Sequence, residues 1–317
     1  MRFYIERVEA SRNFANKIWN ASRFTLMNLD VTENKLPDLN DLQLEDEWIL
    51  SKYNDVVKSV TENLDKFELG IALSNLYDFI WENFCDWYIE LVKPRLFDKE
   101  NPTGKTAQYV LTYVLSNTMK LLHPFMPFIT EEIWQHLPHE GESIMISEWP
   151  EYDEKLNFPK DVESMELIMQ SISAIRNRRA EMNVPPSKKA KVIIVTDKTD
   201  VFKQGTAFFE KLASASEAVV QTDKSGISDN AVNVVVPSAE VFLPLDELVD
   251  KTKELERLNA EKKKLEGEIK RVEGKLNNAG FVSKAPQKVV DEEKAKGEKY
   301  KEMLEKVLEN IKSMENM

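Results

Sequence analysis

The residues best suited to chemistry lie near the N-terminus, on one side of a predicted helix. Basic and amide side chains recur there at about 100° per residue and share one face: Arg12, Asn13, Asn16, Lys17, Asn20 and Arg23. Arginine offers planar, charge-assisted donors, and asparagine offers donors and acceptors together. This mixture suits phosphates and base edges, so the face is a candidate nucleic-acid interface. An ordinary solvated helix face is the alternative.

Two apolar side chains, Phe24 and Met27, also project from this polar side. Packing against another helix is the usual explanation. Alternatively, Phe24 is a platform for an unstacked base, because single-stranded loops are read by aromatic stacking. The opposite face carries Phe14, Ile18 and Trp19 and is predicted to pack into a core.

Two further basic clusters could receive phosphates. The first is Arg176, Arg178, Arg179 and Lys188, with Lys189 and Lys191 beyond them. A solvated helix end, where basic residues are favoured, is its alternative interpretation. The second lies within residues 257–290, which hold nine basic and four acidic residues. Its candidate phosphate contacts are Lys270, Arg271, Lys275, Lys284 and Lys288.

The sequence contains no recognisable catalytic or metal-binding constellation. Residues 101–106 end like a phosphate-binding loop, but Lys99 stands where its first glycine is required. The turn is better interpreted as a helix start. His123, His136 and His139 lack metal-ligand spacing, and His123 is predicted to be a structural residue at a helix end. The sequence predicts binding without a cofactor or metal.

Composition limits the remaining function classes. The 317 residues carry 42% hydrophobic side chains, enough for two or three domains, and a net charge of −12. Nucleic-acid binding must therefore rest on local clusters of Lys and Arg. The single cysteine, Cys85, excludes an internal disulfide and fits a reducing cytoplasm. No apolar run approaches the ~20 residues that span a bilayer, so a soluble, cytoplasmic protein is expected.

Residues 1–150 are predicted to form a helical bundle. Helices are expected at 1–28, 41–67, 69–91, 105–122 and 131–137. Breaks are expected at Pro94, at 101–104 and at the prolines before Ile129. Thr130 is the predicted N-cap of the last helix, with two glutamates in its first turn.

The rest of the chain divides into a small α/β module at 151–245 and a coiled-coil arm at 246–317. The module is predicted from helices at 162–182 and 201–213 and strands at 190–196, 218–222 and 231–236. In the arm, two runs of similar length place apolar residues at heptad a and d positions. They predict an antiparallel hairpin roughly 40 Å long at about 1.5 Å per residue, with an intermolecular coiled coil as the alternative. The fold class expected is mainly α.

Three segments carry a resemblance to a known family. Residues 12–24 resemble the opening helix of the anticodon-binding domain of class I aminoacyl-tRNA synthetases for branched aliphatic amino acids. Residues 123–134 resemble a helix junction shared by the valyl, isoleucyl and leucyl enzymes. Residues 180–189 and the heptad arm favour the valyl-tRNA synthetase family. The resemblance covers essentially the whole chain.

The resemblance implies that this is the C-terminal, tRNA-binding portion of a bacterial valyl-tRNA synthetase. The helical domain would bind the anticodon loop through the face at 12–24, and the hairpin would brace the tRNA body. The whole enzyme would use ATP to join valine to its tRNA and would hydrolyse mischarged threonyl-tRNA. The His-x-Gly-His and Lys-Met-Ser-Lys-Ser signatures of that chemistry are absent from this sequence. The chain alone is therefore expected to be inactive.

The expected partners are valine tRNA and the catalytic domain of the same polypeptide, with no membrane and a monomeric chain. Two alternatives stay open. An isoleucyl-tRNA synthetase fragment is less favoured, because that family commonly ends in a cysteine-rich zinc module and this chain ends in heptads. A coiled-coil adaptor that does not bind RNA is the other alternative.

Overall fold

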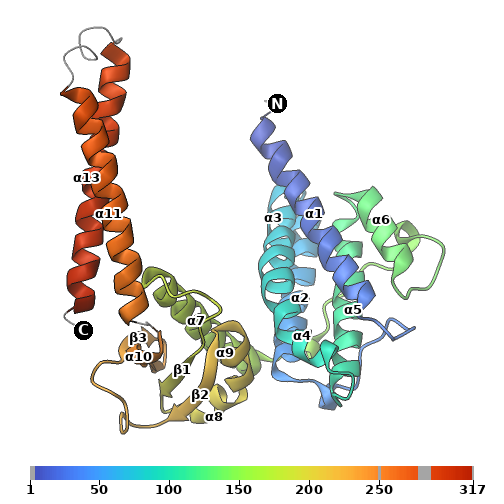
Figure 1. Ribbon diagram of the computed structural model, residues 1–317. Coiled ribbons are helices and arrows are strands. Elements are labelled where there is room, and N and C mark those ends of the chain that lie inside the picture. Colours follow the sequence, from blue (N-terminus) through green and yellow to red (C-terminus); the bar gives the residue numbers. More distant parts are fainter. Residues whose placement is uncertain (1–3, 249–250, 278–286, 316–317) are drawn as a thin grey trace. The chain divides into compact units, whose positions relative to one another are not determined.

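The computed structural model describes residues 4–248, 251–277 and 287–315. The chain divides into two compact units (Figure 1). Unit 1 comprises Met1–Ser173 and Lys198–Phe208, and unit 2 comprises Ala174–Asp197 and Phe209–Met317. Over the described ranges, no helix has the length and apolar character needed to cross a membrane.

Unit 1 is a bundle of helices (Figure 1). Its elements are α1 (Ile5–Met27), α2 (Leu44–Asp65), α3 (Leu69–Asp78), the π-helix η2 (Phe79–Tyr88), α4 (Ile89–Phe97), α5 (Gly104–Leu122) and α6 (Pro127–His136). Short 3-10 turns lie between them at η1 (Leu39–Asp41), η3 (Ile144–Ile146) and η4 (Glu154–Leu156). The short helix α8 (Thr199–Gln204) also belongs to unit 1, and the helix α7 (Pro159–Glu181) begins in unit 1 and continues into unit 2 after Ser173.

Large apolar side chains from several helices fill the core of the bundle. Trp48 and Tyr53 of α2, Phe79 and Tyr88 of η2, and Trp134 of α6 are each at most 1% exposed. The middle helix α5 is buried on most of its circumference, as expected for a helix surrounded by others. The inner face of α1, with Phe14 and Ile18, packs against this core.

The predicted helical bundle is confirmed, but two of its predicted boundaries are wrong. The chain does not break at Pro94, because α4 continues through it to Phe97. Pro94 is exposed, so water can reach the carbonyl that its missing N–H leaves free. Thr130 is not an N-cap, because α6 begins at Pro127. The Thr130 hydroxyl instead donates to the Met126 carbonyl at 2.8 Å.

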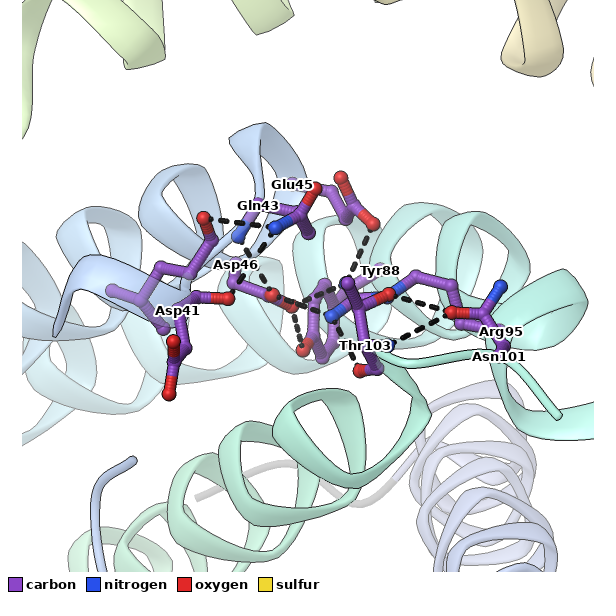
Figure 2. A network of polar contacts seen from close by, with 9 residues as sticks. Asp41, Gln43, Glu45, Asp46, Tyr88, Arg95, Asn101 and Thr103 are labelled. Carbon is purple, nitrogen blue, oxygen red and sulfur yellow. Dashed lines mark hydrogen bonds and ion pairs between the residues drawn. The ribbon is translucent and has the colours of Figure 1, made fainter. Parts of the chain in front are cut away.

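A buried polar network joins α2, η2, α4 and the start of α5 (Figure 2). The guanidinium of Arg95 pairs with Glu45 at 2.6 Å and with Asp46 at 2.9 Å, and it also donates to the Thr103 carbonyl at 2.9 Å. The Tyr88 hydroxyl donates to Asp46 at 2.8 Å. Burial, followed by the neighbouring Asp46 charge, raises the pKa of Glu45. Arg95 offsets these two buried acids and fixes the ends of three helices.

Unit 2 begins with a small α/β module. Its strands are β1 (Ala190–Val195), β2 (Ala215–Gln221), β3 (Val232–Val236) and β4 (Ala239–Leu243). Its short helices are α9 (Thr206–Leu212), whose first three residues belong to unit 1, and α10 (Leu245–Leu248). The sheet has the order β2-β1-β4-β3. The central strand β1 is parallel to β2 and antiparallel to β4, with Ile194 opposite Val241. The predicted module is confirmed.

Two features of this region differ from the prediction. The strand β4 was not predicted; it follows β3 after a tight turn in which Ser238 has φ +61°. The helix expected at 201–213 is interrupted at Gly205, between α8 and α9. A Cβ on Gly205 would lie 2.8 Å from Ile168 Cδ1, so a larger residue there would require Ile168 to shift.

The arm is an antiparallel hairpin of α11 (Lys251–Leu276) and α13 (Gln287–Glu315), which lie side by side (Figure 1). Leu258 and Leu265 of α11 form one buried cluster with Val307 and Ile311 of α13. The predicted hairpin is confirmed, and its heptads are satisfied within one chain. The seam also contains two residues that interrupt the apolar pattern, Glu293 and Gly297.

Candidate nucleic-acid interface

The helix α1 turns one face into the bundle and leaves the other exposed. Phe14, Ile18, Ala21 and Thr25 are buried. The candidate residues on the outer side are exposed: Arg12, Asn13, Asn16, Asn20 and Arg23. None of these five side chains forms a hydrogen bond or ion pair within the part of the chain that the structure describes. Their donors and acceptors are available to a ligand.

Lys17, the sixth polar candidate, is already engaged. Its amine pairs with Asp86 of η2 and lies 4.7 Å from the centre of the Trp81 ring. The side chain retains 29% exposure. A phosphate that binds Lys17 would have to share the amine with Asp86 or displace it.

Phe24 packs against α4 rather than standing free. Its ring meets Phe97 edge-on at 6.3 Å, and the Lys93 amine lies 5.4 Å from its centre. These contacts favour the packing interpretation over the base platform. A small pocket of about 190 Å³ lies beside this contact and includes Lys17, Asn20 and Lys93 in its lining. Lys93 was not among the predicted candidates, although its position beside α1 adds another cation.

Trp19 was predicted to lie in the core, but it is 47% exposed. It borders a pocket of about 450 Å³ between α1 and α6. The lining residues are Trp19, Ser22, Arg23, Leu26, Met27, Glu132, Ile133 and His136. The first and second segments that carry the family resemblance, far apart in sequence, meet at this pocket.

The helical spacing divides the candidates between the two sides of α1. Arg12, Asn16 and Arg23 lie on the side of Trp19 and the larger pocket, at about 100° per residue. Lys17 and Asn20 lie toward the smaller one. The predicted single face is therefore a ridge between two hollows.

The basic residues at the C-terminal end of α7 form hydrogen bonds and an ion pair within unit 2. Arg176 donates to the Leu212 carbonyl at 2.5 Å, and Arg178 pairs with Glu181 at 3.0 Å. Arg179 is only 4% exposed and donates to the carbonyls of Pro185 and Lys188. Burial lowers the pKa of Arg179. Its inward orientation argues against a phosphate contact and corrects that part of the prediction.

Lys188 is half-buried, with its carbonyl turned toward Arg179. In the hairpin, Lys270 and Arg271 are exposed, and Arg271 pairs with Glu268 at 2.7 Å. Lys275 pairs with Glu293 across the seam at 3.2 Å. Lys284 lies outside the described residues, and the side chain of Lys288 is not described. The structure thus brings Lys270, Arg271 and Lys275 together near the end of α11.

The predicted structural role of His123 agrees with its surroundings, since Nδ1 lies 2.8 Å from the Thr130 hydroxyl. Residues 101–104 form a helix-start turn, in which the Asn101 side chain accepts from the Thr103 N–H at 3.0 Å. Among the described side chains, no three His, Cys, Asp or Glu residues are grouped to hold a metal ion. The geometry supports binding chemistry on α1.

Two parts of the chain match models of known protein families. Residues 46–194 match the anticodon-binding domain of tRNA ligases, and residues 250–315 match the valyl tRNA synthetase tRNA binding arm. The bundle from α2 onward therefore belongs to the anticodon-binding class of protein, and the matched residues do not include α1. The predicted resemblance is confirmed in its finer form, because the chain belongs to the valyl-tRNA synthetase family.

The relatives extend this similarity to nearly the whole chain. A valine–tRNA ligase of Clostridium perfringens is 57% identical over 318 residues, and that of Clostridium tetani is 54% identical over 316. The enzyme of Bacillus anthracis is 46% identical over 319 residues. Each alignment covers 99% of this chain and 36% of the relative. The chain therefore spans about a third of the length of these ligases, and they favour the valyl over the isoleucyl alternative.

Proposed function

We propose that this chain is the tRNA-recognition portion of a valine–tRNA ligase and corresponds to its C-terminal part. The observation that carries the proposal is the exposed outer side of α1, where five basic or amide side chains have no partner within the described residues. Unsatisfied amide and guanidinium groups are the chemistry that reads splayed bases and phosphates of an RNA loop. The ligand of α1 is the anticodon loop of valine tRNA.

The three parts of the chain have different roles in this proposal. Residues 1–150 read the anticodon loop, residues 151–245 connect, and residues 246–317 brace the tRNA body. Bracing requires no base contacts, because Lys270, Arg271 and Lys275 reach the backbone by charge. The two kinds of contact supply specificity and affinity separately.

The chemistry of the full-length ligase belongs to the remaining length of the relatives. There we place ATP-dependent activation of valine, its transfer to tRNA and the removal of mischarged threonine. The other partner of this chain is that catalytic portion of the polypeptide, the working form is a monomer, and the compartment is the cytoplasm. No resident cofactor is required for binding tRNA.

The test is the affinity of the 317-residue chain for valine tRNA at two salt concentrations, beside the same tRNA with an altered anticodon. A preference for the native anticodon supports reading by α1. Equal, salt-sensitive affinities leave only bracing by the hairpin. Absence of binding to both tRNAs contradicts the proposal and favours the adaptor alternative.

A paired substitution separates bracing from reading. Lys270→Ala together with Arg271→Ala is expected to weaken both tRNAs equally and to flatten the salt dependence by about 0.7 to 0.9 per lost phosphate contact. The matched control is Lys306→Ala with Lys312→Ala, two exposed lysines at the opposite end of the hairpin. An equal effect of the control pair contradicts a localised contact near the turn.

A further inference from the structure

Unit 1 contains a further cavity, of about 760 Å³, that we call the polar cavity. Its lining comes from the loop after α1, the last turn of α5, the helix α6 and the loop that follows α6. Most of the lining side chains are charged or polar, and none of them lines the two pockets beside α1. The volume lies in the range of small-molecule sites. The polar cavity can therefore hold a small ligand without involving the α1 face.

Two side chains of this lining have a buried polar atom that finds no hydrogen-bond partner among the described residues. One is Trp134 Nε1, which can only donate, and the other is Asn34 Oδ1, which can only accept. The whole Trp134 side chain is buried, at 1% exposure. Buried polar atoms without partners are unfavourable and uncommon. A ligand that both accepts and donates would satisfy this pair.

Unpaired charges of both signs line the same cavity. Lys120 is half-buried, and its amine has no hydrogen bond or ion pair within the described part of the chain. Burial lowers the pKa of Lys120, and the nearby Glu148 raises it in part. Glu140 and Glu148 are exposed, whereas Lys35 is already paired with Glu33. One ammonium and two carboxylates are therefore left for a ligand.

These groups disfavour a ligand that carries charge of one sign. A phosphate or a simple carboxylate would meet Lys120 but also the two unpaired glutamates. A simple amine would meet the glutamates but leave Lys120 and Trp134 Nε1 without an acceptor. A neutral polyol would form hydrogen bonds but give the half-buried ammonium no counter-charge. A small zwitterion satisfies both signs at once.

We propose that the polar cavity binds a free α-amino acid. The carboxylate of the amino acid accepts from the Lys120 amine and from Trp134 Nε1, and its ammonium group donates to Asn34 Oδ1 and Glu148. This site is distinct from the valine-activating site, which belongs to the remaining length of the ligase. The inference does not depend on tRNA binding, so either proposal can fail while the other stands.

The first arm of the test varies the ligand and uses the unaltered 317-residue chain. The probes are glycine, L-valine, L-serine, L-lysine and L-glutamate, with acetate and methylamine as controls of one charge at the same ionic strength. A ¹H–¹⁵N spectrum follows the indole N–H signals of the six tryptophans, and Trp134→Phe assigns the signal of Trp134.

At least one amino acid should shift the Trp134 signal in a saturable way. It should bind about tenfold more tightly than its methyl ester or its N-acetyl derivative, because each derivative lacks one of the two charges. Absence of a shift with all five amino acids overturns the inference. Equal binding by acetate overturns it as well, since a simple anion would then suffice.

The second arm varies the chain. Lys120→Gln should weaken binding of the amino acid by about tenfold, whereas Lys120→Arg keeps the charge and should stay within about threefold. The matched control is Lys105→Gln, an exposed lysine of the same helix α5 outside the lining. Glu148→Gln should weaken binding by about threefold because the side chain is exposed, with the exposed Glu151→Gln as its control.

Unchanged affinity in Lys120→Gln overturns the inference, and so does an equal loss in Lys105→Gln, which would indicate non-specific binding. Thermal unfolding of each variant by circular dichroism separates loss of binding from loss of fold. If Lys120→Gln does not fold, Lys120→Arg and the ligand derivatives still decide the question, because the derivatives require no substitution.

Discussion

Two arginines of unit 1, Arg95 and Arg23, have the same functional group but opposite surroundings. Arg95 is 8% exposed, and two carboxylates and the Thr103 side chain and carbonyl surround it (Figure 2). Arg23 stands on α1 at the edge of a pocket and forms no hydrogen bond or ion pair with any described residue. The first holds helices together, and the second is free to bind.

The difference lies in surroundings and not in residue type. A buried charge is tolerated only with its partners, so removing one partner leaves the others uncompensated. An exposed charge is already hydrated and contributes little to stability. Substituting a buried arginine should therefore lower mainly the free energy of unfolding, and substituting an exposed one should lower mainly the affinity for tRNA.

The largest expected effect is on the buried side of this comparison. Arg95→Met removes the charge but keeps much of the side-chain volume, and leaves Glu45 and Asp46 buried without a cation. We expect a loss of about 3–5 kcal/mol in the free energy of unfolding. Urea unfolding followed by tryptophan emission measures it, and all six tryptophans lie in unit 1. A loss below about 0.5 kcal/mol would refute the structural role of the network.

The next effect is on binding. Arg23→Ala should weaken tRNA binding by about 1–3 kcal/mol, the range for a lost base contact, because a hydrogen-bonding ligand group loses its donor. The free energy of unfolding should change by less than about 0.5 kcal/mol, since the side chain is exposed. Filter binding and urea unfolding on the same preparation test both halves. Large destabilisation with unchanged binding would reverse the assignment.

A third prediction concerns the acids next to the network. Burial, followed by Asp161 and the neighbouring acids of α2, raises the pKa of Glu47 to about 7 from its ordinary 4.5. The folded state then binds more protons than the unfolded state between pH 4.5 and 7, so stability falls as pH rises through this window. Allowing for solvent screening, we expect Glu47 to contribute about 1 kcal/mol to the change in the free energy of unfolding across this pH window. Glu47→Gln should remove it from urea unfolding curves at pH 5 and pH 8, while an unchanged pH dependence would contradict the shift.

The smallest effect is expected at Lys17. Its surroundings are intermediate between those of buried Arg95 and those of exposed Arg23, because its side chain is partly exposed and already paired. Its amine pairs with Asp86. A tRNA phosphate that binds the amine replaces this ion pair, so the net gain in binding free energy is small. Lys17→Ala should weaken binding by less than about 1 kcal/mol and should alter stability by a similar amount. A binding loss as large as that of Arg23→Ala would show that tRNA displaces Asp86. Asp86→Asn is the matched variant, because it releases the amine without removing it.

Regular spacing made much of the fold predictable. Seven-residue repeats predicted the hairpin, and apolar periodicity predicted the bundle and the inner face of α1 at Phe14 and Ile18. Local breakers were less reliable. Pro94 suggested a stop, but burial of Leu91, Val92 and Arg95 around it keeps α4 intact. Tertiary packing outweighed the local preference.

The binding face was predictable in its residue types but not in its surroundings. Periodicity identifies an apolar side of α1, yet it cannot tell whether a neighbour covers Trp19, and α6 leaves it half exposed. Arg179 and Arg178 are adjacent in sequence, but only Arg179 meets the carbonyls of the following loop. The Lys17–Asp86 pair is separated by 69 residues. Such contacts depend on the fold and not on local pattern.

The seam of the hairpin has a further consequence. Glu293 lies in it and accepts from Lys275 on the opposite helix and from Lys296 on its own, each at 3.2 Å. Beside it, a Cβ on Gly297 would lie 3.2 Å from Val272 Cγ1, so only a residue without a side chain fits easily. A slip of one heptad would move these partners apart by about 10 Å along the axis and leave an acid among apolar residues. These contacts therefore favour a single register of α11 against α13, and with it a single length of the arm.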